Sequence, residues 1–241
     1  MDNYTAHVKI ELEFWKREMM KKPSLLNNVT DKVQKKINSY IPDKVHDAIT
    51  TAIKAMIRAV LFGSEYTTSA LPAMDMSMIH REALVKDKIE SYSRTGAAEG
   101  GITGAGGFLM SMADFPLLIG IKMKMLFEIT ALYGFDVKDF RERLYILYIF
   151  QLSFSSQRGA TKIYLHLEDW NEKLHILPDN SDNFDWKTFQ QEYRDYIDIA
   201  KLAQMLPVVG AAVGAVANYQ LLKKLGKTAM MAYRMRLLEK S

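Results

Sequence analysis

The chain has 241 residues, of which 49% are hydrophobic and 25% are charged, and its formal net charge is +4. This composition excludes a disordered chain, because there are enough apolar residues to build a sizeable core. The sequence contains no cysteine, which excludes disulfides and thiolate metal sites. Only six prolines are present, and the balance of residue types favours helices over strands.

Residues 1–63 are predicted to form basic N-terminal helices. The first segment carries an apolar stripe at helical spacing, formed by Val8, Leu12, Trp15 and Met19. Its charges recur every few residues, which is not the pattern of a secretory signal. A third helix would start near Pro42 and end at Gly63. Residues 64–73 are rich in turn formers and are predicted to be a linker.

Residues 74–160 are predicted to contain the core helices and a glycine-rich stretch. Six of the chain's 13 glycines lie between Gly96 and Gly107. Gly96, Gly100 and Gly104 are four residues apart, so on a helix they fall along one edge. Each glycine inside a helix costs roughly 0.5–1 kcal/mol relative to alanine, and close approach of a second helix would offset that cost. A phosphate-binding loop is the alternative, but the sequence lacks the preceding strand and the following Gly-Lys-Ser/Thr.

Asp114-Phe115-Pro116 is predicted to be a corner between two helices. A residue before proline is disfavoured in the α conformation, Pro116 can occupy a first helical turn, and Asp114 can cap that turn. The helix that follows is strongly apolar, and Tyr133-Gly134 is predicted to end it.

The next predicted helix follows Asp136 and Asp139. Asp139, with Glu142 three residues later, fits a capping box. The helix itself, up to about Phe154, is apolar almost all round and is therefore expected to be central.

Residues 161–186 are predicted to be an acidic, loop-rich insert. Between Leu165 and Ala200 nine acidic residues face three basic ones, a local net charge of −6. His166 and His175 suggest a metal site, but they do not have the spacing of a known ligand set. We therefore expect surface polar residues here, with no metal and no cofactor.

Residues 187–241 are predicted to form the C-terminal helices. Lys201 and Lys223 bracket 21 uncharged residues, a length that suits a bilayer span, although a proline and several amides interrupt it. Gly210 and Gly214 are again four residues apart. We interpret residues 202–222 as a second helix with small residues, packed against the first.

The last predicted helix, residues 221–240, is basic. Between Leu221 and Ser241 six basic residues face one acidic residue, a local net charge of +5. Basic side chains near an anionic lipid surface contribute roughly 1 kcal/mol each to binding. The candidates for contact with a membrane surface are therefore Lys223, Lys227 and Arg234.

Several segments together resemble the EcsC protein family. They are residues 96–107 with Ala113–Pro116, Tyr133–Asp136 with Glu142–Leu144, Leu206–Gly210 with Asn218-Tyr219 and Arg234–Arg236, and at the N-terminus Glu13–Trp15 and Ile41–Val45. The resemblance implies a bacterial helical protein without an established biochemical activity. The family takes its name from an operon that also encodes an ABC transporter linked to secretion and peptide export. It supplies no catalytic residues.

The resemblance and the small-residue patterns give one set of residues assigned to helix packing, capping and the family pattern. The set is Gly96, Gly100, Gly104, Gly107, Asp114, Pro116, Tyr133, Gly134, Asp136, Gly210, Gly214 and Asn218. The predicted fold is all-α, a single domain over residues 1–241 in which two Gly/Ala-rich central helices pack closely.

Three functions remain open. The first is a non-enzymatic protein in the cytoplasm or at the inner face of the membrane, binding an anionic surface or a membrane protein and assisting an ABC transporter. The second is a soluble helical domain that binds a lipid, a peptide or another apolar ligand between its helices. The third is an enzyme that uses Asp114 as a buried carboxylate, although no catalytic constellation is visible. Nucleic-acid binding is not expected, because no recognised module is present.

Overall fold

The computed structural model describes residues 3–21, 43–62, 76–105, 107–180, 183–185 and 211–238, together with residues 187–189, 191, 193, 197 and 202. The long helices in these residues are α1 (Asn3–Met20), α3 (Asp43–Phe62), α4 (Met78–Ala105), α5 (Gly107–Leu132), α6 (Phe140–Phe154), α7 (Gln157–Glu168) and α11 (Ala211–Leu238). A short helix, α8 (Trp170–Lys173), follows α7. The described residues form no strand, only one isolated bridge between Ser155 and Ile197. The predicted all-α bundle is confirmed.

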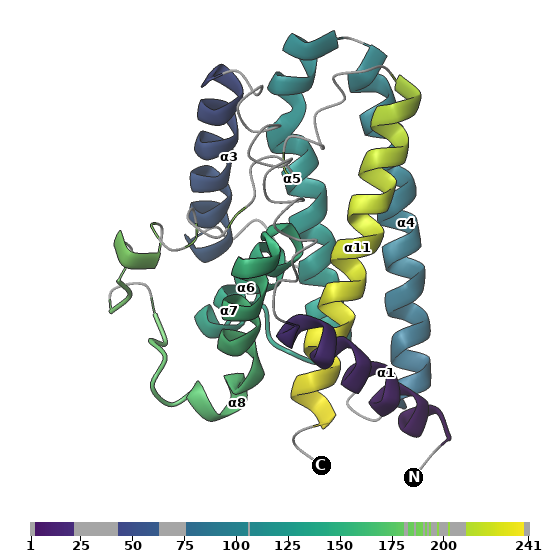
Figure 1. Cartoon of the computed structure of the whole chain (residues 1–241), viewed down its shortest axis with the longest axis vertical. Coiled ribbons are helices and arrows are strands. Elements are labelled where there is room, and N and C mark those ends of the chain that lie inside the picture. The colour runs from purple at the N-terminus through teal and green to yellow at the C-terminus, as the bar shows by residue number, and fades with distance from the viewer. Residues whose placement is uncertain are drawn as a thin grey trace.

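The three longest helices, α4, α5 and α11, lie side by side along the longest axis of the molecule (Figure 1). α4 packs against both α11 and α5, α11 lies between α4 and α5 in this view, and α3 packs against α5 on the side away from α4. α6, α7 and α8 fill the lower part of the bundle, and α1 crosses the lower ends of α4 and α11. The two termini are therefore at the same end of the molecule.

α6 is buried along nearly its whole length, as its apolar composition predicts. Its buried residues occur at almost every position and include Glu142 and Gln151. A helix that is apolar on all sides gains most from burial when other helices surround it. α3, in contrast, is amphipathic, with Ile53, Ile57 and Val60 buried and Lys54 exposed.

The predicted corner at Asp114-Phe115-Pro116 is wrong. Pro116 lies inside α5, which begins at Gly107, nine residues before the proline, and α4 ends at Ala105. A proline inside a helix costs about 3 kcal/mol. Phe115, Leu118 and Ile119 are all buried, and full burial of such side chains contributes about 1.5–3 kcal/mol each. Tertiary packing therefore outweighs the local preference, and Asp114 is a half-buried residue of the helix interior rather than a cap.

The predicted boundary between two C-terminal helices near residue 222 is also wrong. One continuous helix, α11, runs from Ala211 to Leu238. Nothing in residues 211–238 breaks a helix, and the change from small to basic side chains alters the surface of the helix without interrupting its backbone. Gly210, the rest of residues 203–210 and the predicted linker at 64–73 lie outside the described residues.

The first part of the predicted acidic, loop-rich insert is helical and contributes buried residues to the core. α7 and α8 take up residues 157–168 and 170–173, and Ile163, Leu167 and Trp170 are buried. The expected loop-rich character begins only after α8, where residues 174–180 form turns and bends.

The turn between α5 and α6 is built by local hydrogen bonds. Gly134 has φ = 87°, a left-handed conformation that glycine adopts without a steric penalty. Its N–H donates to the carbonyl of Ala131, and the N–H of Phe135 donates to the carbonyl of Thr130, the Schellman pattern. The side chain of Asp139 then accepts from the N–H of Arg141 as the N-cap of α6. Nearby, the Asp136 side chain accepts from the N–H of Lys138.

Candidate functional site: a basic groove above a buried ion-pair network

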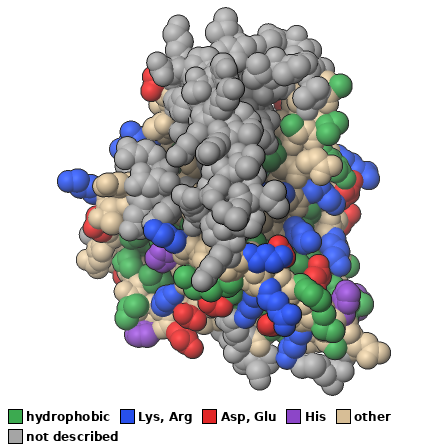
Figure 2. Space-filling model, in the orientation of Figure 1, with side chains coloured by type: hydrophobic (Ala, Val, Ile, Leu, Met, Phe, Trp, Pro, Cys, Tyr) green, Lys and Arg blue, Asp and Glu red, His purple; other side chains and the backbone are tan. Residues whose placement is uncertain are grey.

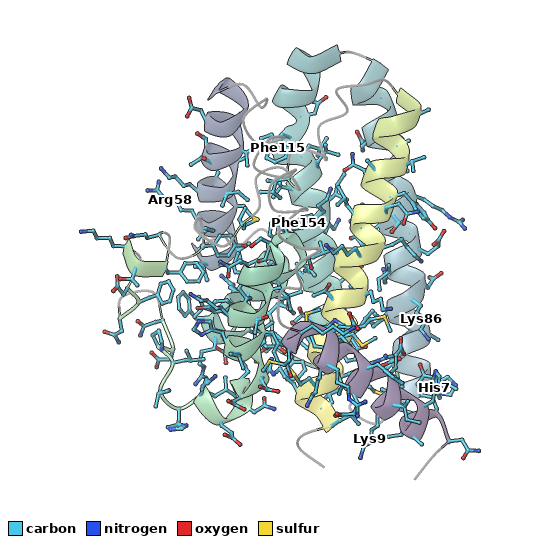
Figure 3. All side chains as sticks on the ribbon, in the orientation of Figure 1. His7, Lys9, Arg58, Lys86, Phe115 and Phe154 are labelled. Atoms are coloured by element: carbon cyan, nitrogen blue, oxygen red, sulfur yellow. The ribbon has the colours of Figure 1, made fainter. Side chains whose placement is uncertain are left out.

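A groove of about 600 Å³ lies where α1 crosses α4 and α11. α4 and α11 supply four lysines to it. Among the described residues, the groove is lined by Glu11, Lys86, Ile89, Gln220, Lys223, Lys224, Lys227, Met230, Met231 and Arg234. Figure 2 shows Lys and Arg side chains gathered on this part of the surface. Figure 3 places Lys86 of α4 at the same end of the molecule as His7 and Lys9 of α1.

The floor of the groove is apolar because α4 and α11 approach each other closely there. Ile89 and the two methionines, Met230 and Met231, are buried. Gly226 allows this approach, since a Cβ atom built on it would lie 2.5 Å from Cγ1 of Ile89. The groove therefore combines a cationic rim with a floor of flexible, polarisable side chains.

Arg234 lies at the inner side of the groove and anchors an ion-pair network. Its Nε and Nη2 donate to the two carboxylate oxygens of Glu82, each at 2.6 Å, and its Nη1 donates to Oε2 of Glu11 at 2.7 Å. The side chain of Glu82 is completely buried and that of Arg234 is 2% exposed. The hydroxyls of Tyr4 and Tyr133 also donate to Glu82, at 2.6 and 3.3 Å. Bidentate, charge-assisted pairing of this kind is what makes burial of an arginine tolerable.

This burial corrects the prediction that Arg234 contacts a membrane surface. The guanidinium points into the protein, while Lys224 and Lys227 of the same helix are exposed. Lys223 is half-buried, and its Nζ donates to Oε2 of Glu90 at 3.2 Å.

The network lowers the pKa of the Glu11 carboxyl and raises the pKa values of the Tyr4 and Tyr133 hydroxyls. Partial burial is the largest single influence on Glu11 and opposes its charge. The hydrogen bond to Arg234 and the positive charges of Arg234, Lys227 and His7 together outweigh it and lower the pKa of Glu11. Burial, followed by the hydrogen bond to Glu82, raises the pKa of Tyr4 to about 12. Burial and then the Glu82 charge raise the pKa of Tyr133 well above its usual value. Both tyrosines therefore remain neutral donors at physiological pH.

A second ion pair joins α11 to α6. Arg236 donates through Nη1 and Nη2 to the two oxygens of Glu142, at 2.6 and 2.8 Å, and its Nε donates to Oδ1 of Asn171 at 3.1 Å. The guanidinium lies 4.0 Å from the ring centroid of Phe135 and 4.6 Å from that of Tyr145. Glu142, expected in a capping box, serves this buried pair instead.

The small-residue edges of α4 and α11 are in contact above the groove. A Cβ atom on Gly96 would lie 2.2 Å from Cδ1 of Leu222. One on Gly100 would lie 2.7 Å from the carbonyl oxygen of Gly214 and 2.7 Å from Nδ2 of Asn218. Gly104 lies within α4 and Gly107 begins α5.

A buried lysine, Lys122 of α5, lies beside the contact between α4 and α11 and is hydrogen-bonded to Asn218 of α11. Nζ of Lys122 in α5 donates to Oδ1 of Asn218 at 3.0 Å and to the carbonyl of Leu118 at 3.3 Å. The amide of Asn218 in turn donates to the carbonyl of Gly214 at 3.2 Å. Burial lowers the pKa of Lys122 to about 7.

The sequence interpretation missed several of these residues. Glu82 and Lys122 look like ordinary helix-surface charges, and no local pattern marks them as buried. Glu142 is predicted from the sequence as part of a capping box, but not as the partner in a buried ion pair. A close helix contact at Gly226 can be predicted from the sequence, because the spacing of four residues between Gly210 and Gly214 continues through residues 218 and 222 to 226.

Comparison with known proteins identifies the family. The model of the EcsC protein family matches residues 6–238. The chain belongs to the EcsC protein family. It is 44% identical over 227 residues to Protein EcsC of Bacillus subtilis (strain 168), covering 94% of this chain and 93% of that protein. The Uncharacterized protein YdbA of the same organism is 34% identical over 146 residues, which is 60% of this chain and 54% of that protein. No solved structure matches.

Two further findings concern the described residues of this EcsC-family chain. None of their helices has the length and hydropathy to cross a membrane. Within the same residues, no three His, Cys, Asp or Glu side chains gather where they could hold a metal ion. His166, which the sequence raised as a candidate ligand, lies on α7 and stacks on the ring of Tyr148.

Proposed function

We propose that this EcsC-family protein is a non-enzymatic binding protein that docks on anionic membrane surfaces through the rim of the basic groove. The observation that carries the proposal is the set of four lysines around one groove with an apolar floor. Lysines near an anionic bilayer contribute roughly 1 kcal/mol each, so four of them would give reversible binding that depends on salt.

The lysines on the rim differ in exposure. Lys224 and Lys227 are exposed, and Lys223 is half-buried with Glu90 3.2 Å away. Lys86 is exposed, and its Nζ lies 3.4 Å from the hydroxyl of Tyr4. Lys224 and Lys227 are therefore the first residues to test.

Flotation with vesicles that contain anionic phospholipid tests the proposal. The wild-type protein is expected to co-float at low salt and to be released at high salt. The double variant Lys224→Gln/Lys227→Gln is expected to lose most of this binding. Absence of co-flotation at low salt would overturn the proposal.

A matched control is available on α3. Lys54 and Arg58 are exposed, and Figure 3 shows Arg58 projecting outward from α3, away from the groove. Lys54→Gln/Arg58→Gln removes the same number of charges as the groove variant. Its binding is expected to stay close to that of the wild type; an equal loss in both variants would indicate that overall charge, and not the groove, attracts the vesicles.

We also propose that docking places the protein at the cytoplasmic face, as an accessory to ABC-transporter-linked secretion or peptide export. This role follows from the family resemblance, and the cationic rim is compatible with it. Fractionation of native cells, with salt and carbonate washes, tests the location. Co-purification with the transporter subunits tests the association.

A further inference from the structure

We propose that the groove binds the anionic head of a single amphiphilic lipid, and that Glu11 occupies the position of this head when no lipid is bound. The inference rests on the proposed membrane role and deepens it, because it names one ligand chemistry and one internal competitor. The chemical class is a phosphate head that carries an alkyl chain, supplied by the bilayer.

The geometry around Arg234 separates a fixed partner from a replaceable one. Glu82 holds Nε and Nη2 of the guanidinium, is completely buried, and accepts two tyrosine hydroxyls as well. Glu11 holds only Nη1, at 2.7 Å, and its side chain is 38% exposed. An anion entering the groove can therefore replace the carboxylate of Glu11 without disturbing the pair between Arg234 and Glu82.

The charges around Glu11 favour an incoming phosphate. Among the described residues that line the groove, five are basic and Glu11 is the one acid. The charges of Arg234 and Lys227 both act to lower the pKa of Glu11, so the same cations would stabilise another oxyanion at this position. Arginine and lysine together are a common combination for phosphate recognition.

The apolar floor accounts for the alkyl chain. Ile89, Met230 and Met231 line the groove beside the cations. Methionine side chains adapt to irregular apolar ligands. The volume of about 600 Å³ falls within the roughly 300–1,000 Å³ of typical small-molecule sites. The groove is therefore large enough for a headgroup and part of one chain.

Isothermal titration with octyl phosphate, kept below its micellar concentration, tests the inference on the full chain. The wild type is expected to bind octyl phosphate more tightly than inorganic phosphate or octanol. Equal binding of inorganic phosphate would overturn the role of the chain, and equal binding of octanol would overturn the role of the anion. Failure to bind octyl phosphate would overturn the inference.

The decisive variant is Glu11→Gln. Removing the internal competitor is expected to tighten octyl phosphate binding by about three- to tenfold, the scale of one partly exposed ion pair. Glu13→Gln, on the exposed side of α1 and outside the groove, changes the net charge equally and is expected to alter affinity by less than about twofold. Unchanged or weaker binding by Glu11→Gln would overturn the role of Glu11.

A second variant keeps the inference testable if Glu11→Gln fails to fold. Lys227→Gln, at an exposed position, is expected to weaken octyl phosphate binding by about threefold or more; no change would count against the groove. The outcomes also separate the two proposals. Vesicle binding without octyl phosphate binding would overturn only this inference. Octyl phosphate binding without vesicle binding would overturn only the membrane role.

Discussion

Arg234 and Arg236 show how two residues of one helix can connect it to different neighbours. Side chains two positions apart on a helix point in widely different directions. Arg234 accordingly reaches Glu82 on α4, whereas Arg236 reaches Glu142 on α6. Breaking a buried pair by removing one charge costs about 3–5 kcal/mol, because the other charge stays buried without compensation.

We expect Glu82→Gln to lower the free energy of unfolding by about 3–5 kcal/mol, because it leaves Arg234 buried opposite a neutral amide. Urea denaturation followed by circular dichroism measures the change. Glu90→Gln, on the same helix but paired with the exposed Arg94 and the half-buried Lys223, is the control and should shift the midpoint far less. Similar shifts in the two variants would contradict the importance assigned to burial.

Lys122 raises a different question at the residue scale, since its two hydrogen-bond acceptors are neutral. Burial lowers its pKa from 10.5 to about 7. Between these two values the unfolded chain binds a proton at this residue that the folded chain has largely released. The contribution of Lys122 to the free energy of unfolding therefore rises with pH across this window.

We expect Lys122→Met to remove this pH dependence. Between pH 7 and about 9.5, the unfolding free energy of the wild type should rise relative to that of the variant by roughly 2–3 kcal/mol. Tyrosines of the unfolded chain begin to ionise at the upper end of this window, but they do so in both proteins, so the difference between the two profiles reports Lys122. Urea midpoints at both pH values measure the difference, and parallel profiles for the two proteins would contradict a lowered pKa.

At the scale of elements, the contact between α4 and α11 depends on the absence of side chains. Gly100 lies against the backbone of Gly214, and a carbonyl oxygen cannot move aside as the end of a flexible side chain can. Gly120 on α5 offers the opposite situation, because a Cβ atom there would meet nothing within 4 Å. Comparing an alanine at Gly120 with one at Gly100 therefore distinguishes the helix preference for alanine, which acts at both positions, from the cost of overpacking, which acts only at Gly100.

We expect Gly100→Ala to lower the free energy of unfolding by about 1–3 kcal/mol, since overpacking exceeds the gain in helix propensity. Gly120→Ala should instead raise it by about 0.5–1 kcal/mol. Thermal and urea denaturation of both variants would measure the contrast. A stabilised Gly100→Ala protein would show that the two helices can separate at little cost.

On the scale of the whole molecule, one hydrophobic cluster connects the first described helix with the last. It includes Leu12 of α1, Ile53 of α3, Phe150 of α6 and Met235 of α11. Trp15 of α1 packs edge-on against Tyr164 of α7, with ring centroids 5.6 Å apart. A core shared in this way favours unfolding of all helices in one step.

We therefore expect the chain to unfold in a single cooperative transition, as one domain. Far-UV circular dichroism and tryptophan fluorescence should give the same midpoint, both in the wild type and in a Trp15→Phe variant that shifts the fluorescence signal away from α1. Separate transitions for the two probes would indicate that α1 or another part unfolds independently.

Much of the architecture can be read from the sequence, because helices are selected by patterns within one or two turns. Apolar periodicity predicts the all-α class. Gly96 and Gly100 are four residues apart, which predicts a close contact with another helix. In the structure, Gly100 makes this contact with Gly214 of α11. Gly134 predicts the end of α5, and Asp139 predicts the start of α6; the structure shows the turn at Gly134 and the N-cap at Asp139. Each of these features depends on residues nearby in the chain.

The groove could not be read in the same way, because its chemistry depends on residues far apart in the sequence. Lys227 and Arg234 are both basic positions of one helix, yet one is exposed and the other is buried against Glu82, 152 residues away. Pro116 likewise stays inside α5 because neighbouring helices bury the residues around it. Burial and charge pairing depend on which surfaces meet, so the packed helices fix them and no local pattern does.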